Sequence, residues 1–134
     1  FSRISKMLPT FCIAEILEVY NDPLPFAIRL SNTKNPKVKE MYHGTKSQYV
    51  HGILRNGLKA SHNRVSAYGK GTYFSPQARL SLFSYTNKSS IDELSYVFLC
   101  DVIVNDTGGN KRNIYVCPRD DSFRIKYLIR FFKP

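Results

Sequence analysis

Hydrophobic residues near the start of the chain recur at the spacing of a helix. Ile13, Ile16, Leu17 and Tyr20 stand at positions i, i+3, i+4 and i+7, so one face of a helix would be apolar. Asn21-Asp22-Pro23 follows directly, and such a triplet is typical of a helix end. The pattern predicts one amphipathic helix before this triplet.

A polar and basic segment at residues 32–39 follows, and it has the composition of a linker. We therefore expect two parts in the chain. Residues 1–39 would form an N-terminal helix and linker, packed on or leading into a folded core at residues 40–134.

The first part of this core predicts a short strand and then a helix. The strand is expected over Val38 to His43, and the helix from Ser47 to Asn56. Gly57 stands where a left-handed C-cap is favoured. The buried stripe of this helix would consist of Val50, Ile53 and Leu54.

In the middle of the chain, short elements alternate with loops. Residues 59–71 show little periodicity and predict a loop, and Thr72 to Phe74 predicts a brief strand. Ser75-Pro76 combines an N-cap residue with proline at the first helical position, so a second helix is expected to about Tyr85. Residues 86–94 predict a polar loop.

The last third of the chain is rich in strand patterns. Tyr96 to Val104 predicts a central strand buried on both faces, Gly108-Gly109 a turn, and Ile114 to Cys117 another strand. The final strand would have one wet face. Its buried residues would be Ile125, Tyr127, Ile129 and Phe131, and its wet residues Arg124, Lys126, Leu128 and Arg130. Because strands dominate without a regular βαβ alternation, we expect an α+β fold.

Length and composition fit one globular domain. The chain has 134 residues, of which 43% are hydrophobic and 13% aromatic. Its first residue is not Met, so we expect a piece of a longer protein. The longest apolar run, residues 96–104, is too short to cross a bilayer, and no membrane partner is expected.

The cysteines and histidines give no sign of a disulfide framework or a metal site. The chain has three cysteines, an odd number without a Cys-x-x-Cys pair, which favours a reducing, intracellular location in the cytoplasm or nucleus. His43, His51 and His62 fit no metal-ligand spacing, so no metal is expected.

The net charge is +10 at pH 7. Such a balance favours a surface that attracts the phosphates of a nucleotide, with possible weak contact to nucleic acid. A solvated basic surface without a partner explains the same charge equally well.

Two short motifs can cradle a flat ligand that carries an amide. His43-Gly44 lies at a strand end, where a neutral imidazole donates or accepts a hydrogen bond. Gly69-Lys70-Gly71 runs into Tyr73-Phe74 and matches neither a dinucleotide fingerprint nor a Walker A loop. Each motif also has a structural reading, as a histidine bonded to a nearby carbonyl and as a glycine turn. No carboxylate pair suggests hydrolysis.

Taken together, the motifs Tyr42-His43-Gly44-Thr45, Ile53 to Leu58 and Tyr68 to Ser75 resemble the catalytic domain of the poly(ADP-ribose) polymerase-like ADP-ribosyltransferases. Leu99 to Val102 and Lys126 to Ile129 are similar to two further strands of that family. The resemblance covers about residues 40–132. It implies a split antiparallel β-sheet with few short helices, and a groove that binds NAD.

The resemblance implies a role for each matched residue. His43 would hydrogen-bond the adenosine ribose, Gly44 would hold the nicotinamide carboxamide through its backbone, and Tyr73 would stack on the nicotinamide ring. Residues 59–70 would form a donor loop over the dinucleotide, and Ser81 would bond the carboxamide. The other residues implied at the NAD site are Thr45, Tyr68, Gly71 and Tyr85.

Two positions depart from the family pattern. The second stacking tyrosine is expected eleven residues after Tyr73, where this chain has Ser84, and Tyr85 comes one residue later. The glutamate of polymer-forming members is expected twelve residues before Lys126, where this chain has Ile114. Isoleucine has no acceptor atom and cannot act as a base. The catalytic triad would therefore be His43, Tyr73 and Ile114. It resembles the mono-ADP-ribosylating branch, which transfers one ADP-ribose from NAD to protein side chains.

Two alternatives remain open on the sequence. An RNA 2′-phosphotransferase shares the fold and the Tyr-His-Gly-Thr opening, but its His-x-His element is absent from Gly71-Thr72-Tyr73-Phe74. A catalytically degenerate NAD-binding module is the other, because Ile114 and the displaced Tyr85 permit a loss of turnover.

Overall fold

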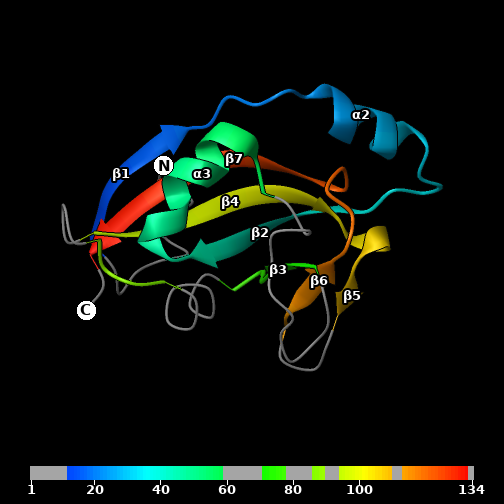
Figure 1. Cartoon of the computed structure of the whole chain (residues 1–134). Helices are drawn as coiled ribbons and strands as arrows, with labels where there is room; N and C mark the ends of the chain where they lie inside the picture. The colour runs from blue at the N-terminus through cyan, green and yellow to red at the C-terminus, as the bar shows by residue number, and fades with distance from the viewer. Residues whose placement is uncertain (1–11, 59–70, 78–85, 90–93, 110–112, 133–134) are drawn as a thin grey trace.

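The structure is a computed structural model of the chain, and it describes residues 12–58, 71–77, 86–89, 94–109 and 113–132. Figure 1 shows the elements of this part. The strands are β1 (Cys12–Glu18), β2 (Val38–Thr45), β3 (Thr72–Phe74), β4 (Ser95–Ile103), β5 (Gly108–Gly109), β6 (Tyr115–Cys117) and β7 (Phe123–Phe132). The helices are α2 (Leu24–Ser31) and α3 (Val50–Asn56), with the 3-10 turns η1 (Ser47–Tyr49) and η3 (Val104–Asp106).

The strands form two antiparallel sheets that meet at one point. The larger sheet has the order β1-β7-β4-β2, and the smaller has the order β3-β6-β5. They are joined at a single bridge, where Tyr42 N–H donates to Ser75 O at 2.7 Å and Ser75 N–H donates to Tyr42 O at 2.9 Å. The predicted α+β fold with a split antiparallel sheet is confirmed.

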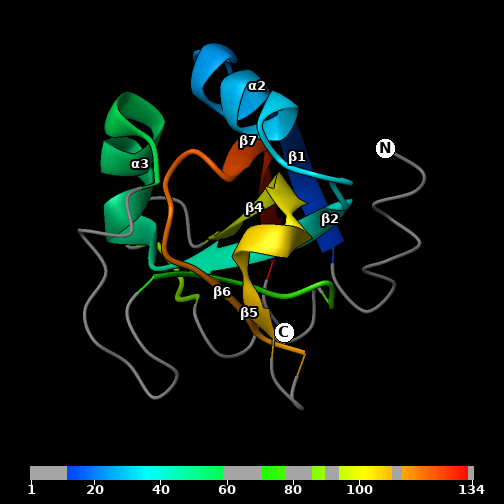
Figure 2. The ribbon, with the colours of Figure 1, turned by 90° about the vertical axis from the view of Figure 1, so that its right-hand side faces the viewer.

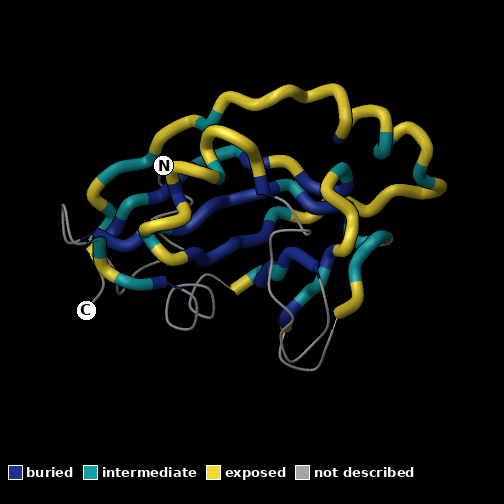
Figure 3. The backbone as a smooth tube through the Cα atoms, in the orientation of Figure 1, coloured by how far each residue is buried: buried dark blue, intermediate teal, exposed yellow. Residues whose placement is uncertain are grey.

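β4 is the central strand and is buried on both faces, as predicted. All of its residues are buried except Tyr96 and Asp101, which are half-buried (Figure 3). One face of the larger sheet packs against α3, which lies beside the sheet in Figure 2. The first cluster of buried residues lies on this face and consists of Met41, Val50, Leu58, Phe74, Phe98, Cys100, Val102, Cys117, Phe123, Ile125 and Leu128. Tyr42, Val97, Leu99, Ile129 and Phe131 form a second cluster. Neighbouring residues of β2 and β4 divide between the two clusters, because side chains alternate along a strand.

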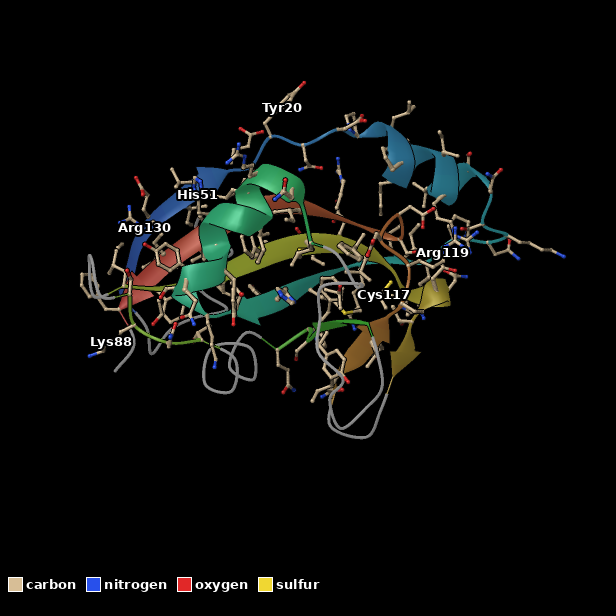
Figure 4. All side chains as sticks on the ribbon, in the orientation of Figure 1. Tyr20, His51, Lys88, Cys117, Arg119 and Arg130 are labelled. Carbon is tan, nitrogen blue, oxygen red and sulfur yellow. The ribbon has the colours of Figure 1, made fainter. Side chains whose placement is uncertain are left out.

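The predicted N-terminal helix is wrong, because its residues form β1. This strand pairs with β7, and the register shifts between Ile13 and Glu15. The bulge places Ile13 and Ile16 on one side although they are three residues apart, and both pack against the second cluster. Pairing with β7 therefore overrides the helical spacing, while Tyr20 is 94% exposed and points away from the sheet (Figure 4). The predicted boundary after residue 39 falls inside β2.

The predicted wet face of the last strand is partly wrong for a similar reason. The pairing of β7 with β4 shifts at Lys126, since Leu99 is opposite Tyr127 and Cys100 is opposite Ile125. After this shift Leu128 lies in the first cluster and is only 3% exposed. Lys126 points its ammonium at Glu40, with 2.6 Å between Nζ and Oε2.

The sequence reading missed α2 and took its start for a helix end. Asp22 accepts a hydrogen bond from Leu24 N at 3.0 Å, and proline stands at the first turn. These are features of a helix beginning. Within α2 only Phe26 is buried, so the helix has no wide apolar stripe that a pattern search could find.

Most other predicted elements are confirmed within the described residues, namely β2, α3, β3, β4 and β6. Gly57 has a positive φ of +80° at the C-cap of α3, although its ψ of 169° is extended rather than left-handed helical. Leu54 is 43% exposed and does not join the predicted stripe. Gly108 and Gly109 form β5 instead of the predicted turn. The predicted helix after Ser75-Pro76 lies largely outside the described residues.

α2 is held to the sheet by a clamp around Asp106. Arg29 in its last turn donates to both carboxylate oxygens of Asp106, at 2.6 and 2.9 Å, and Ser122 Oγ donates to the same carboxylate at 2.7 Å. The hydrogen bond from Arg29 lowers the pKa of Asp106. The carboxylate therefore links α2, η3 and the residue before β7.

We expect Asp106→Asn to destabilise the fold in a pH-dependent way. A carboxylate with a lowered folded pKa stabilises above the unfolded pKa of about 3.9 and loses that effect as pH falls through the folded pKa. Urea unfolding should therefore show a loss in the variant at pH 7 that shrinks toward pH 3. Asp121→Asn is the matched control, because Arg119 and Asp121 pair within one exposed loop at 2.9 Å. An equal loss in both variants would contradict the clamp.

Candidate functional site

The bridge between the two sheets brings His43 of β2 next to Tyr73 of β3. The Nδ1 of His43 lies 2.7 Å from the carbonyl oxygen of Tyr73. A carbonyl only accepts, so Nδ1 carries the proton and donates it. In the neutral ring, Nε2 is then an acceptor, and it makes no hydrogen bond within the described part of the chain.

His43 is held neutral by its surroundings. Its residue is 9% exposed, and the ring of Phe74 lies 5.7 Å from the imidazole centroid. Burial lowers the pKa of His43, and the hydrogen bond to Tyr73 opposes this only in part. The imidazole is therefore uncharged at neutral pH. The sequence left two readings of His43 open, a carbonyl-bonded histidine and a ligand-binding one. The geometry is compatible with both interpretations at once, because Nδ1 bonds the carbonyl of Tyr73 and Nε2 is left as an acceptor.

Gly44 presents its backbone on the open edge of β2. Strand pairing alternates, and β2 exposes the N–H and C=O of every second residue to this edge. Tyr42 uses its N–H and C=O for the bridge to Ser75. Lys37, at an odd position just before β2, points its carbonyl the other way and accepts a hydrogen bond from Val104 N, next to β4, at 2.8 Å. Gly44 is two residues after Tyr42 in the same strand, so its N–H and C=O also point away from β4. Continuing the bridge would pair Gly44 with Tyr73, but no backbone hydrogen bond joins these two residues.

The other predicted residues of this region fall into two groups. Thr45 ends β2 and is 7% exposed, and Tyr73 is half-buried on β3. Ile114 is 7% exposed and lies two residues before Val116, which is paired with Tyr73. Tyr68, Ser81, Tyr85 and the predicted donor loop at residues 59–70 lie outside the described residues. The structure thus brings His43, Gly44 and Tyr73 to one junction, and Ile114 directly precedes β6, the strand paired with β3.

Gly71 allows β3 to approach β6 closely. A Cβ atom built on Gly71 would lie 2.8 Å from Val116 Cγ1 and 2.9 Å from the carbonyl oxygen of Cys117. Real Cβ atoms do not come so close to such atoms, so a side chain here would push Tyr73 or β6 aside. The role of Gly71 in this structure is close packing beside the site.

The buried cysteines offer no nucleophile. Burial raises the pKa of Cys117 to about 11 and raises that of Cys100 further. Both side chains are therefore neutral thiols at pH 7, and Cys117 donates weakly to Arg119 O at 3.4 Å.

A cavity of about 300 Å³ lies elsewhere and contains none of the predicted site residues. Its apolar wall includes Phe26, Leu58 and Phe123, and Asp22 and Asp121 lie at its polar side. The sequence reading missed it, because α2 forms one wall and was not predicted. The junction differs from this cavity because it brings a neutral histidine next to the backbone of Gly44, which has no strand partner on that edge among the described residues.

The described residues contain no group of three or more His, Cys, Asp or Glu side chains arranged to hold a metal ion. No helix among them has the length and apolarity to span a membrane.

We expect the pKa of His43 to lie below 6.5, the ordinary value for histidine. Because the unfolded state then binds the proton more readily, the free energy of unfolding should fall as pH drops from about 6.5 through the folded pKa. NMR titration of the imidazole and urea unfolding from pH 7.5 to 5.5 measure the two effects. His43→Gln should remove this part of the pH dependence. A midpoint above 6.5 would contradict the buried environment.

Gly71→Ala should lower the free energy of unfolding by about 1–3 kcal/mol, the usual cost of overpacking. Gly52→Ala is the matched control, because a Cβ at Gly52 in α3 meets nothing within 4 Å. That control should gain about 0.5–1 kcal/mol from the better helix former. Thermal unfolding of both variants provides the comparison, and similar stabilities would refute the close approach.

Comparison with known proteins gives three findings. The family model described as "Poly(ADP-ribose) polymerase catalytic domain" matches residues 6–111. The mouse (Mus musculus) protein mono-ADP-ribosyltransferase PARP10 is 28% identical over 87 residues, which are 63% of this chain and 9% of that protein. The chain thus spans a small part of this relative.

The third finding concerns the fold. The crystal structure of the PARP domain of Arabidopsis RADICAL-INDUCED CELL DEATH1 superposes with a TM-score of 0.83 at 15% identity, over 99% of this chain and 98% of that one. None of these matches supports the RNA 2′-phosphotransferase alternative. Since the family model matches well over half of the chain, the chain belongs to the poly(ADP-ribose) polymerase catalytic-domain family.

Proposed function

We propose that the chain is an NAD-dependent mono-ADP-ribosyltransferase. It would move one ADP-ribose from NAD to a protein side chain and release nicotinamide. The observation that carries this proposal is the junction of Gly44, His43 and Tyr73. The relative named a mono-ADP-ribosyltransferase supports the reaction class.

The backbone of Gly44 suits the amide of nicotinamide. Its N–H donates and its C=O accepts, and both face the edge where no strand pairs. A carboxamide offers the complementary pair, a C=O that accepts and an NH₂ that donates. The amide of the ligand would continue the ladder of backbone hydrogen bonds that ends at the bridge between Tyr42 and Ser75. Tyr73 stands across this gap and would stack on the ring.

His43 suits a ribose hydroxyl. Its Nδ1 is committed to Tyr73 O at 2.7 Å, so the neutral Nε2 accepts. A hydroxyl is a donor that matches it. Because burial keeps the imidazole neutral, Nε2 does not become a second N–H at pH 7.

Fixing both ends of NAD would promote cleavage between them. The bond from the nicotinamide nitrogen to the ribose breaks, and its electron pair goes to nicotinamide, which leaves neutral. The acceptor atom would then form the new bond to the ribose carbon and release its proton to water. The ribose carries developing positive charge in between, so binding energy from the two held ends contributes to lowering the barrier.

Ile114 supports transfer of a single unit. Its buried hydrocarbon side chain, which lies two residues before the strand partner of Tyr73, offers no acceptor for a ribose hydroxyl and no base for a second transfer.

Incubation with NAD and candidate acceptor proteins should add one ADP-ribose to each modified site. Intact mass spectrometry followed by site mapping measures the result. Successive additions on one site would contradict the role of Ile114. Release of ADP-ribose cyclic phosphate from 2′-phosphorylated RNA would favour the phosphotransferase reading.

His43→Gln should lower the affinity for NAD about tenfold, which is the upper part of the range for one hydrogen bond. His51→Gln makes the same change on the exposed face of α3 (Figure 4) and should leave the affinity unchanged. Calorimetric titration with NAD measures both. If the wild-type chain binds no NAD, the proposal fails, whereas NAD binding without any transfer would favour the degenerate NAD-binding module.

A further inference from the structure

The imidazole of His43 is fixed by two contacts from the same strand. The carbonyl of Tyr73 holds one edge of the ring, with 2.7 Å from its oxygen to Nδ1. The ring of Phe74, the next residue, contacts the imidazole with a centroid distance of 5.7 Å and an interplanar angle of 57°. The contact with Tyr73 determines which ring nitrogen of His43 donates a hydrogen bond, and the contact with Phe74 restricts the plane of the imidazole.

Phe74 is itself fixed from behind. It is 1% exposed, and its ring lies 5.0 Å from that of Phe123 at an angle of 58°. Tilted aromatic pairs at these distances attract through ring edge and ring face, so each ring favours one orientation of the next. The three rings form a row that runs from Phe123 at the start of β7 to His43 on β2.

The rotation about χ2 of histidine is broad and has two preferred orientations half a turn apart. A half turn of His43 would exchange Nδ1 with Cδ2 and Nε2 with Cε1, and it would move the free acceptor away from the ligand side. The turned ring would place a carbon against Tyr73 O and lose the hydrogen bond, so this bond disfavours the turn by the free energy of a single hydrogen bond. The ring of Phe74 occupies the space beside the imidazole and restricts the turn further.

We propose that Phe74 is a positioning residue, whose ring, supported by Phe123, keeps His43 in the orientation that donates Nδ1–H to Tyr73 and leaves Nε2 as the acceptor. The benefit for NAD binding rests on the proposed function, whereas the orientation of His43 does not. Phe74 touches no reacting atom in this account and acts through His43.

The direct test is the tautomer and titration of His43 by two-bond ¹H–¹⁵N NMR on the free protein. Wild type should show the Nδ1–H tautomer. Phe74→Leu should show a mixture of tautomers and a raised pKa, because the smaller side chain admits rotation and water. Phe131→Leu is the matched control, since Phe131 is fully buried in the second cluster and should leave His43 unchanged.

The result that overturns the proposal is a His43 with wild-type tautomer and titration in folded Phe74→Leu. Should that variant fail to fold, Phe123→Leu removes the support one ring farther away and should shift the same signals in the same direction. No shift there would also overturn the proposal. Neither readout needs NAD, so failure of the proposed function leaves this test intact.

A double-mutant cycle separates positioning from general destabilisation. Phe74→Leu should weaken NAD binding about threefold to tenfold, the range of one aromatic pair. In a His43→Gln background the same change should cost less than about twofold, because its route through His43 is gone. Equal costs in both backgrounds would show that Phe74 acts otherwise. Absence of NAD binding in wild type would instead count against the proposed function alone.

Discussion

The site depends on the place where the hydrogen-bond ladder between β2 and β3 stops. Tyr42 and Ser75 exchange two backbone hydrogen bonds, and the next pair in the same register, Gly44 and Tyr73, exchanges none. A backbone donor and acceptor that leave a ladder at a buried residue such as Gly44 need another partner, since unpaired groups cost free energy. A ligand with an amide satisfies both groups at once. The split of the sheet therefore leaves Gly44 with a backbone donor and acceptor that suit a group which both accepts and donates.

The elements around this edge hold β3 in a defined position relative to β2. Gly71 lets β3 lie against β6, so that Tyr73 stays opposite Val116. Phe74 of β3 packs in the first cluster, and its ring lies next to His43. Close packing and one side-chain hydrogen bond thus set the relative position of two strands that share only one bridge. A site made in this way is sensitive to small changes in volume nearby.

Two bulges explain where pattern reading failed. The shift in β1 brings Ile13 and Ile16 to one side, which in sequence resembles a helix face. The shift in β7 turns Leu128 inward and directs Lys126 to Glu40. A bulge adds one residue to one strand, so it changes the phase of the side chains without changing the composition. α2 was missed for another reason, because Phe26 and the Arg29–Asp106 clamp hold it instead of an apolar stripe.

Local patterns were enough to predict the strands with strong periodicity, the helix α3 and the family resemblance, and they proposed His43, Gly44, Tyr73 and Ile114 as site residues. These predictions follow from local composition and from motifs whose order is visible along the chain. Packing between distant segments accounts for β1, for α2 and for the place of Phe74 and Gly71 beside the junction. It also decided which nitrogen of His43 is left to accept, because that depends on a carbonyl thirty residues away. Pairing partners, bulges and proton positions arise from contacts between distant segments, and no local pattern specifies them.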